Sequence, residues 1–284
     1  MASDLQTMEK ALRVLPAAGA QEVSRMGALE LRMHFLAENL FADGESNLYY
    51  AEGDRMVIGG IRAGKPVPLP PQRELGTRFF LERRELGAIN LGAAGLIRAG
   101  GRDFRLQHLD CLYVGMGCEE IEFASEGEEA AEFYLLSCPA HRAYPTAKIQ
   151  AADSVAASVG DAAHASCRTI HKYICPETVP TCQLTMGVTT LEANNVWNTW
   201  PPHTHGRRSE VYLYFNLGDG TVTHLMGRPE ETRHILVRDR QAVYSPAWSV
   251  HSGAGTNRYS FVWGMAGENQ DFGDVDVVAP DELR

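Results

Sequence analysis

The sequence predicts an all-β protein with a few short helices, arranged as two related β-sandwich domains. Short runs rich in β-branched and aromatic residues follow one another along most of the 284-residue chain, and glycine-rich turns such as Gly59-Gly60 and Gly100-Gly101 separate them. Closely spaced short strands of this kind are typical of sandwiches and barrels. The same texture occurs in both halves, and the length allows two domains.

The N-terminal half begins with two segments that are not predicted strands. Residues 1–20 have no long apolar run after a basic start, which is not the pattern of a signal peptide, and we expect a tail there. Residues 21–36 carry helical spacing over part of their length and predict a short helix. We expect residues 21–155 to form the first domain. Its strands are predicted at residues 47–50, 56–58, 88–91, 95–98, 111–114, 121–123 and 133–136.

The C-terminal half follows a small, polar connection at residues 151–166. We expect residues 156–284 to form the second domain. From Gln270 onward the chain is acidic, and we expect a solvated arm or a subunit contact there rather than part of a site. The strands of this half are predicted at residues 182–188, 210–215, 222–226, 234–237, 242–244 and 259–263.

One stretch of the second half predicts a metal site. His203 and His205 are two residues apart, so an extended backbone directs both imidazoles to the same face, and Glu210 follows at the head of a predicted strand. His251, beyond the turn at Pro246, is the best candidate for a fourth ligand. Three neutral imidazoles and one carboxylate suit zinc, iron, manganese or nickel. We therefore expect these four side chains to bind one divalent ion.

Strand alternation places further residues around this predicted site. If Glu210 points to the metal, Tyr212 points to the same side and borders the substrate. The intervening residues then pack against the opposite face; these are Val211, Leu213 and Phe215.

Two arginines, Arg207 and Arg208, lie in the turn between the predicted ligands. A guanidinium can grip both oxygens of a carboxylate, so both are candidate substrate-binding residues. Solvated loop charges are the alternative interpretation.

Composition excludes several classes of partner. Lys and Arg number 26 against 36 Asp and Glu, which gives a net charge of −10 and disfavours nucleic acid. No stretch approaches the roughly 20 apolar residues that a membrane span needs. The six cysteines are irregularly spaced without a Cys-x-x-Cys motif, which favours reduced thiols. We expect a cytoplasmic protein that acts on a small molecule.

The predicted ligands resemble the two metal motifs of the cupin superfamily, His-x-His followed by four residues and Glu, and a distant Pro-x-x-x-x-His. Six segments in chain order also resemble the bacterial 5-keto-4-deoxyuronate isomerase family, and this likeness runs from about residue 22 to the C-terminus. The six segments are residues 79–90, 112–117, 140–146, 198–205, 231–235 and 261–270.

This resemblance implies two cupin-like double-stranded β-helix (jelly-roll) domains and an aldose–ketose type isomerase. The reaction it implies converts 4-deoxy-L-threo-5-hexosulose uronate, a breakdown product of pectin and related polyuronides, to 3-deoxy-D-glycero-2,5-hexodiulosonate. It also implies one Zn²⁺ per chain and a homo-oligomer, with hexamers known in the family. A divalent ion suits this chemistry because it stabilises the oxygen charge of an enediol-like intermediate.

The proton-transfer group stays open at this point. Lys148, His171, Lys172 and Tyr212 lie in motif-like segments and are the candidates, with a metal-bound water as the alternative. Arg233, in another family-like segment, is a third candidate for substrate binding.

Overlaying the two halves predicts that the first domain holds no metal. The positions of His203 and His205 fall on Thr77 and Phe79, and the position of His251 falls on Glu120. Threonine and phenylalanine cannot replace two imidazoles, so we expect a structural role for this half.

Two other functions remain compatible with the sequence. A cupin with these ligands could be an iron-dependent oxygenase, which metal content and oxygen uptake would distinguish. The third possibility is a non-catalytic protein that binds sugar acids, although no basic helix-turn-helix segment supports a regulatory version.

Overall fold

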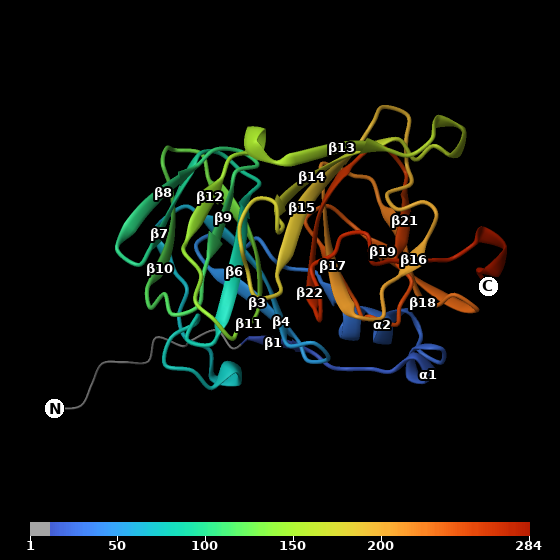
Figure 1. The fold of residues 1–284 in the computed structure, drawn as a ribbon, viewed down its shortest axis with the longest axis horizontal. Coiled ribbons are helices and arrows are strands. Elements are labelled where there is room, and N and C mark those ends of the chain that lie inside the picture. The colour runs from blue at the N-terminus through green and yellow to red at the C-terminus, as the bar shows by residue number, and fades with distance from the viewer. Residues whose placement is uncertain (1–11) are drawn as a thin grey trace.

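Two β-sandwiches lie side by side and form four stacked layers (Figure 1). The computed structural model describes residues 12–284, so most of the predicted N-terminal tail lies outside the described residues. Between the outer layers, two seven-stranded sheets face each other. The predicted all-β fold, with two cupin-like jelly rolls, is confirmed.

The first sandwich pairs a seven-stranded sheet with a four-stranded sheet. In spatial order, the larger sheet contains β1 (Arg13–Leu15), β3 (Ser46–Ala51), β4 (Met56–Ala63), β11 (Ala131–Pro139), β6 (Arg84–Asn90), β9 (Cys111–Val114) and β12 (Ala147–Ile149). The smaller sheet contains β5 (Val67–Pro68), β10 (Ile121–Ser125), β7 (Gly95–Ala99) and β8 (Arg102–Leu106).

The second sandwich repeats this plan with a seven-stranded and a three-stranded sheet. The larger sheet contains β13 (Val155–Val159), β14 (Arg168–Ile174), β15 (Thr185–Leu191), β22 (Ser260–Gly267), β17 (Arg208–Phe215), β20 (Ala242–Ser245) and β2 (Leu36–Ala37). The smaller sheet contains β19 (Glu231–Val237), β18 (Val222–Arg228) and β21 (Ser252–Gly255), and a separate ribbon pairs β16 (His203–Thr204) with β23 (Asp276–Val277).

The few helices are short. They are α1 (Ala20–Val23), α2 (Ala28–Phe35) and the 3₁₀ turns Arg73–Leu75, Ala151–Asp153, Ala162–His164 and Pro280–Glu282. Among the described residues, no helix has the length and apolar composition that crossing a membrane would require.

The two large sheets share one strand order, which agrees with the internal repeat seen in the sequence. The order β3-β4-β11-β6-β9 corresponds to β14-β15-β22-β17-β20. Leu86 pairs with Val114 on β9, and Glu210 pairs with Ser245 on β20. Leu86 therefore occupies in the first sandwich the place that Glu210 occupies in the second.

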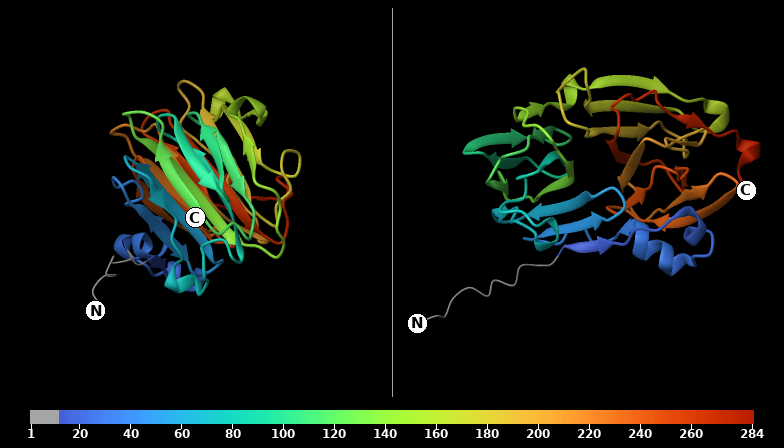
Figure 2. Two further views of the ribbon diagram at one scale, coloured as in Figure 1. Left: turned by 90° about the vertical axis from the view of Figure 1, so that its left-hand side faces the viewer. Right: turned by 60° about the horizontal axis from the view of Figure 1, so that its bottom comes forward.

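The N-terminal segment is arranged differently from the boundary predicted at residue 20. Residues 13–15 are not a tail, because β1 pairs in parallel with β3. Residues 21–37, which were expected in the first domain, lie on the second sandwich: Leu36 of β2 pairs with Val243, and Phe35 stacks on Tyr244 with ring centroids 6.4 Å apart. Figure 2 shows both helices beneath strands of the second half. The crossing buries Leu31 and Phe35 of α2, which local sequence alone could not assign to a partner.

A buried carboxylate and close backbone contact join the two large sheets. Glu85 is fully buried and accepts hydrogen bonds from the backbone N–H groups of Cys182, Gln183 and Leu184, at 2.8, 2.9 and 2.9 Å. A Cβ atom placed on Gly264 would lie 2.2 Å from a Leu136 methyl carbon, so any larger residue there would displace the Leu136 side chain. The sheets are therefore held together firmly behind the predicted site.

Candidate metal centre

Four side chains from separate elements meet in the second sandwich. His203 lies on β16, His205 on the turn after it, Glu210 on β17 and His251 just before β21. One ligand atom from each lies within 4.8 Å of all the others, so the group could hold a metal ion. These are the four ligands predicted from the sequence.

The nitrogen and oxygen atoms of this group point inward at one another. Glu210 Oε2 lies 2.9 Å from His251 Nε2 and 3.1 Å from His205 Nε2, and His203 Nε2 lies 3.0 Å from His251 Nε2. His205 Nδ1–H donates to the Arg208 carbonyl at 2.9 Å, which leaves the Nε2 lone pair directed at the cluster. Three imidazole nitrogens and one carboxylate in this arrangement fit a divalent first-row metal.

The electrostatics of His203 and Glu210 favour the states that bind a cation, whereas Glu210 outweighs burial and raises the pKa of His205. Burial, helped by the neighbouring His251, lowers the pKa of His203 to about 2, so this imidazole is neutral at physiological pH. Burial alone would raise the pKa of Glu210, but His251 and His205 outweigh it and the net pKa is lowered. A neutral imidazole and an ionised carboxylate are the forms that coordinate metals.

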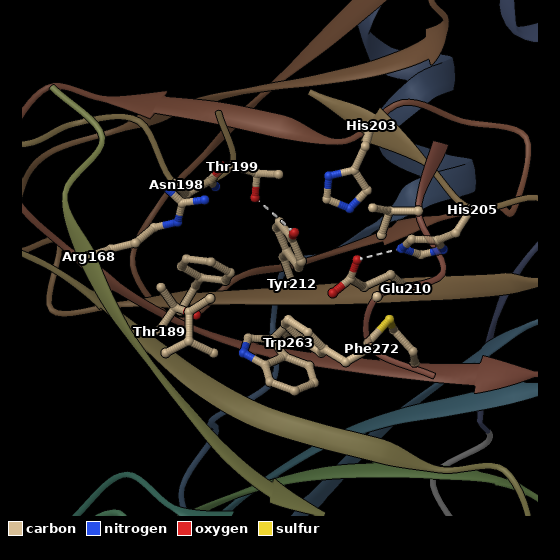
Figure 3. A pocket seen from close by; sticks show the side chains of 15 residues that line it. Arg168, Thr189, Asn198, Thr199, His203, His205, Glu210, Tyr212, Trp263 and Phe272 are labelled. Carbon is tan, nitrogen blue, oxygen red and sulfur yellow. Dashed lines mark hydrogen bonds and ion pairs between the residues drawn. The ribbon is translucent and has the colours of Figure 1, made fainter. Parts of the chain in front are cut away.

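Three of the four side chains, His203, His205 and Glu210, line a cavity of about 290 Å³, which we call the metal cavity (Figure 3). Its walls come from β14, β15, β17 and β22, from the segment before β16, and from the C-terminal segment. Besides His203, His205 and Glu210, the lining residues are Arg168, Ile170, Thr189, Asn198, Thr199, Tyr212, Phe261, Trp263, Met265, Phe272, Gly273 and Val275.

A few polar groups are set into these mostly apolar walls. Arg168 is the one Lys or Arg among the lining residues, and burial lowers its pKa. The Tyr212 and Thr199 hydroxyls hydrogen-bond at 3.0 Å. Among the described residues, Asn198 Oδ1 and Trp263 Nε1 are buried without a hydrogen-bond partner. Unsatisfied buried polar atoms beside a cavity are available to a bound molecule.

The structure brings one of the four proton-transfer candidates into the metal cavity. Tyr212 lines it, as strand alternation predicted. Lys148 instead pairs with Asp110 at 2.8 Å in the first sandwich. His171 faces away from the cavity and contacts Ser154 Oγ at 2.9 Å.

Lys172, the fourth candidate, also lies outside the metal cavity. It pairs with Glu177 at 3.0 Å, and its ammonium lies 5.7 Å from the centre of the Phe272 ring. Lys172 follows Ile170 by two residues on β14 but lies further along the strand, where it lines a different cavity.

The three arginines predicted to bind substrate serve other contacts. Arg207 donates through Nε to Asp274 at 2.8 Å. Arg208 is buried and donates through Nη2 to the Asp274 carbonyl at 2.9 Å. Arg233 bonds the Ser24 carbonyl and so connects β19 with the end of α1. None of the three lines the metal cavity.

The acidic C-terminal segment was expected to stay apart from the site, and this prediction was wrong. Phe272, Gly273 and Val275 line the metal cavity, and Val277 of β23 pairs with His203. The acidic residues are not simply solvated, because Asp274 binds Arg207. Its charge therefore anchors the segment over the ligands.

The cavity residues that sequence reasoning missed lacked a local signal. Arg168 begins a strand and resembles any exposed strand arginine, and Trp263 and Phe272 resemble core or surface aromatics. Asn198, Thr199 and Trp263 lie in family-like segments, which was the one available indication.

The first sandwich is filled where the second is hollow. Its interior contains a continuous apolar cluster that includes Phe80, Leu81, Leu86 and Phe133. In the described part of the chain, the one group of three or more metal-ligating side chains is that of the second sandwich. That the first half binds no metal stays a prediction.

Comparison with known proteins identifies the family. The sequence matches the KduI/IolB family over residues 35–277. The chain belongs to the KduI/IolB family. Among its KduI/IolB relatives, a protein of Yersinia enterocolitica is 50% identical over 89% of this chain and 93% of its own length, and one of Opitutus terrae is 47% identical over 93% and 96%. Both are named 4-deoxy-L-threo-5-hexosulose-uronate ketol-isomerase. The family resemblance seen in the sequence is confirmed.

Solved structures support the fold of this KduI/IolB member. An IolB-like protein from Salmonella typhimurium LT2 superposes with a TM-score of 0.71 at 16% identity, over 86% of this chain and 96% of its own. A mutant of Bacillus subtilis oxalate decarboxylase superposes with a TM-score of 0.55 at 10% identity, over 78% and 71%. At these identities the likeness concerns the fold alone.

Proposed function

We propose that this chain is a metal-dependent ketol-isomerase that converts 4-deoxy-L-threo-5-hexosulose uronate to 3-deoxy-D-glycero-2,5-hexodiulosonate. The relatives named for this ketol-isomerase activity cover nearly the whole chain at close to half identity. The reaction belongs to the breakdown of pectin and related polyuronides. The observation that carries the proposal is the position of Arg168 across the metal cavity from the three histidines and Glu210.

The substrate carries its reacting group and its carboxylate at opposite ends, as the cavity carries the metal ligands and Arg168 on opposite sides. A hexosulose uronate has an aldehyde at one end of six carbons and a carboxylate at the other. Figure 3 shows Arg168 on one side of the cavity and His203, His205 and Glu210 on the other, with Tyr212 between them. We assign the carboxylate to Arg168, whose planar guanidinium can donate two parallel hydrogen bonds to it. The aldehyde and its neighbouring hydroxyl then reach the metal end.

The donor set is suited to Zn²⁺, with one ion per chain held by His203, His205, Glu210 and His251. A bound divalent cation would act as a Lewis acid that stabilises negative charge on the oxygens of the reacting carbons. We give Glu210 no further role, because its lowered pKa makes the carboxylate a weak base.

Isomerisation also moves protons between neighbouring atoms. One proton leaves C2 and one is added to C1, while the hydroxyl hydrogen passes from the C2 oxygen to the C1 oxygen. Burial raises the pKa of Tyr212 well above its usual value, so its phenol stays neutral. A neutral phenol paired with the Thr199 hydroxyl can accept one proton and donate another, which suits transfer between the two oxygens. We assign that transfer to Tyr212.

We also propose that the protein is cytoplasmic and self-associates, as the family resemblance implies. All six cysteines are free, which suits a reducing compartment. An exposed apolar patch formed by Leu29, Met33 and Leu236 is a candidate interface between copies, with exposed fractions of 78%, 68% and 52%. Light scattering of the wild type and of Leu29→Glu/Met33→Glu tests it, and an unchanged mass in the variant would contradict the assignment of this patch.

The deciding experiment combines turnover with metal content. Purified protein is assayed on enzymatically generated 5-keto-4-deoxyuronate before and after chelation, with metal analysis and oxygen uptake in parallel. We expect turnover that needs one metal per chain and consumes no oxygen. Metal-loaded protein that leaves this substrate unchanged would refute the proposal, and oxygen consumption would point to an oxygenase.

A further inference from the structure

A loop at the C-terminus, residues 269–276, closes one side of the metal cavity. Asn269 Nδ2 donates to Asp274 Oδ2 at 2.6 Å and joins the two ends of the loop. Arg207 holds the same carboxylate, and Gln270 Nε2 donates to the Leu184 carbonyl at 3.3 Å. The loop is therefore fixed on both sides, and its tip carries Phe272.

The Phe272 ring separates two cavities. It packs on Trp263 with ring centroids 5.2 Å apart, and both residues line the metal cavity. Both also line a second cavity of about 370 Å³, which we call the side cavity. Gly273 is the third residue common to the two. The partition thus consists of two aromatic side chains and one glycine.

The side cavity carries polar groups that the proposed reaction does not use. Lys172, Gln270, Glu177 and Asp271 line it, as does Thr185, whose buried hydroxyl has no partner among the described residues. Lys172 pairs with Glu177, whose side chain is 56% exposed, and such solvent-facing pairs contribute little. An ammonium and an unsatisfied hydroxyl are groups that a carboxylate and sugar hydroxyls would bind.

We propose that Phe272 sets the length of the substrate by walling off the side cavity from the metal cavity. This inference rests on the proposed function. In a 1,4-linked uronide the next residue is attached near the middle of the six-carbon chain. Figure 3 shows Trp263 and Phe272 together on one side of the line from Arg168 to the metal ligands, where that residue would project. With Phe272 in place the cavity takes a single uronate, and without it a second uronate reaches Lys172.

The test compares Phe272→Ala and Phe272→Leu with wild type. The control is Phe104→Ala, which removes a partly buried phenyl ring from β8 in the other sandwich. For each of these proteins we measure kcat/KM for two substrates, a 1,4-linked diuronate with a free reducing end and 5-keto-4-deoxyuronate. The readout is the ratio of the first value to the second. We expect this ratio to rise at least about tenfold in Phe272→Ala, less in Phe272→Leu, and not in the control.

Binding provides a readout that does not depend on turnover. The same diuronate, reduced to an alditol so that it cannot react, is titrated into each protein by calorimetry. We expect its Kd to fall about tenfold in Phe272→Ala, and part of this gain to be lost in Phe272→Ala/Lys172→Met. A folded, metal-loaded Phe272→Ala protein with wild-type Kd and wild-type ratio would overturn the inference. Failure of the wild type to isomerise 5-keto-4-deoxyuronate would instead refute the proposed function, and the binding comparison would still test the partition.

Discussion

The Nε2 atoms of His203 and His251 lie 3.0 Å apart and face each other, with Glu210 Oε2 within 2.9 Å of the second. Two neutral imidazoles cannot both present lone pairs at this distance without a cation or a proton between them. A single hydrogen on His251 Nε2 points to either His203 or Glu210, whereas a divalent cation among the three groups satisfies all of them, which favours a metal centre.

Replacing His251 by alanine tests that centre directly. Its Nε2 contacts both His203 and Glu210, so its loss leaves an incomplete donor set. We expect metal affinity to fall at least about 100-fold, with activity falling in parallel. Calorimetric metal titration and metal analysis measure the effect. His234→Ala removes an exposed histidine from β19 and is the control; equal metal content in the two variants would argue against the four-ligand site.

Arg168→Met tests the carboxylate assignment. Hydrogen bonds to charged groups contribute about 1.5–3 kcal/mol each, so we expect KM for the uronate to rise about 10- to 100-fold with smaller effects on kcat. Metal content should not change, because Arg168 contacts none of the ligands within hydrogen-bond range. Arg258→Met, which removes an exposed arginine, is the matched control. A normal KM in Arg168→Met would place the carboxylate elsewhere.

Tyr212→Phe tests proton transfer. The substitution keeps the aromatic ring between the ligands and Arg168 but removes the hydroxyl that pairs with Thr199. We expect kcat to fall about 10²- to 10⁴-fold, with metal affinity and KM close to wild type. Thr199→Val should lower kcat by less, because the phenol remains. If Tyr212→Phe retains wild-type kcat, another group moves the proton.

Glu85→Gln tests the junction between the sandwiches. The buried carboxylate accepts three backbone N–H bonds and one from the Tyr113 hydroxyl at 2.8 Å. A glutamine amide has one acceptor oxygen and would leave buried donors unsatisfied, so we expect the free energy of unfolding to fall by about 2–4 kcal/mol. Urea denaturation measures it, with the exposed Glu128→Gln as control. Equal stability of the two variants would show that Glu85 is dispensable.

The sequence could predict those parts of the site that depend on neighbours along one chain segment. His203, His205 and Glu210 lie within eight residues, and strand alternation then placed Tyr212 correctly. Arg168 could not be found this way, because β15 and β22 lie between its strand β14 and the ligand strand β17. Phe272 was hidden for another reason. It lies among aspartates that look solvated, and only the fold shows that Asp274 is bound by Arg207.

The same distinction applies to the fold. Short strands and turns are local features, and they predicted an all-β protein correctly. The passage of residues 20–37 onto the second sandwich depends on Phe35 meeting Tyr244, a contact between distant parts of the chain. Domain boundaries drawn from composition cannot detect such a crossing.

The last prediction concerns acid stability and His224, which is fully buried between the Tyr214 hydroxyl and Ser245. Burial lowers its pKa from 6.5 to about 3. Between these two values the unfolded chain binds a proton that the folded chain does not. This group therefore leaves the free energy of unfolding unchanged above pH 6.5 and lowers it as the pH falls toward 3. The loss approaches about 1.4 kcal/mol per pH unit within this window.

His224→Gln removes this titration while keeping a side chain that can hydrogen-bond to both neighbours. We expect the variant to be less stable than wild type at pH 7 but to lose less stability between pH 6.5 and 4. Urea denaturation at several pH values measures how the free energy of unfolding of each protein changes with pH. Metal-free proteins are used, because protonation of the metal ligands would otherwise release a bound ion and add to the change. If the free energy of unfolding changes equally with pH in the two proteins, His224 does not cause the acid sensitivity, because the protonation of the four predicted ligands is common to both.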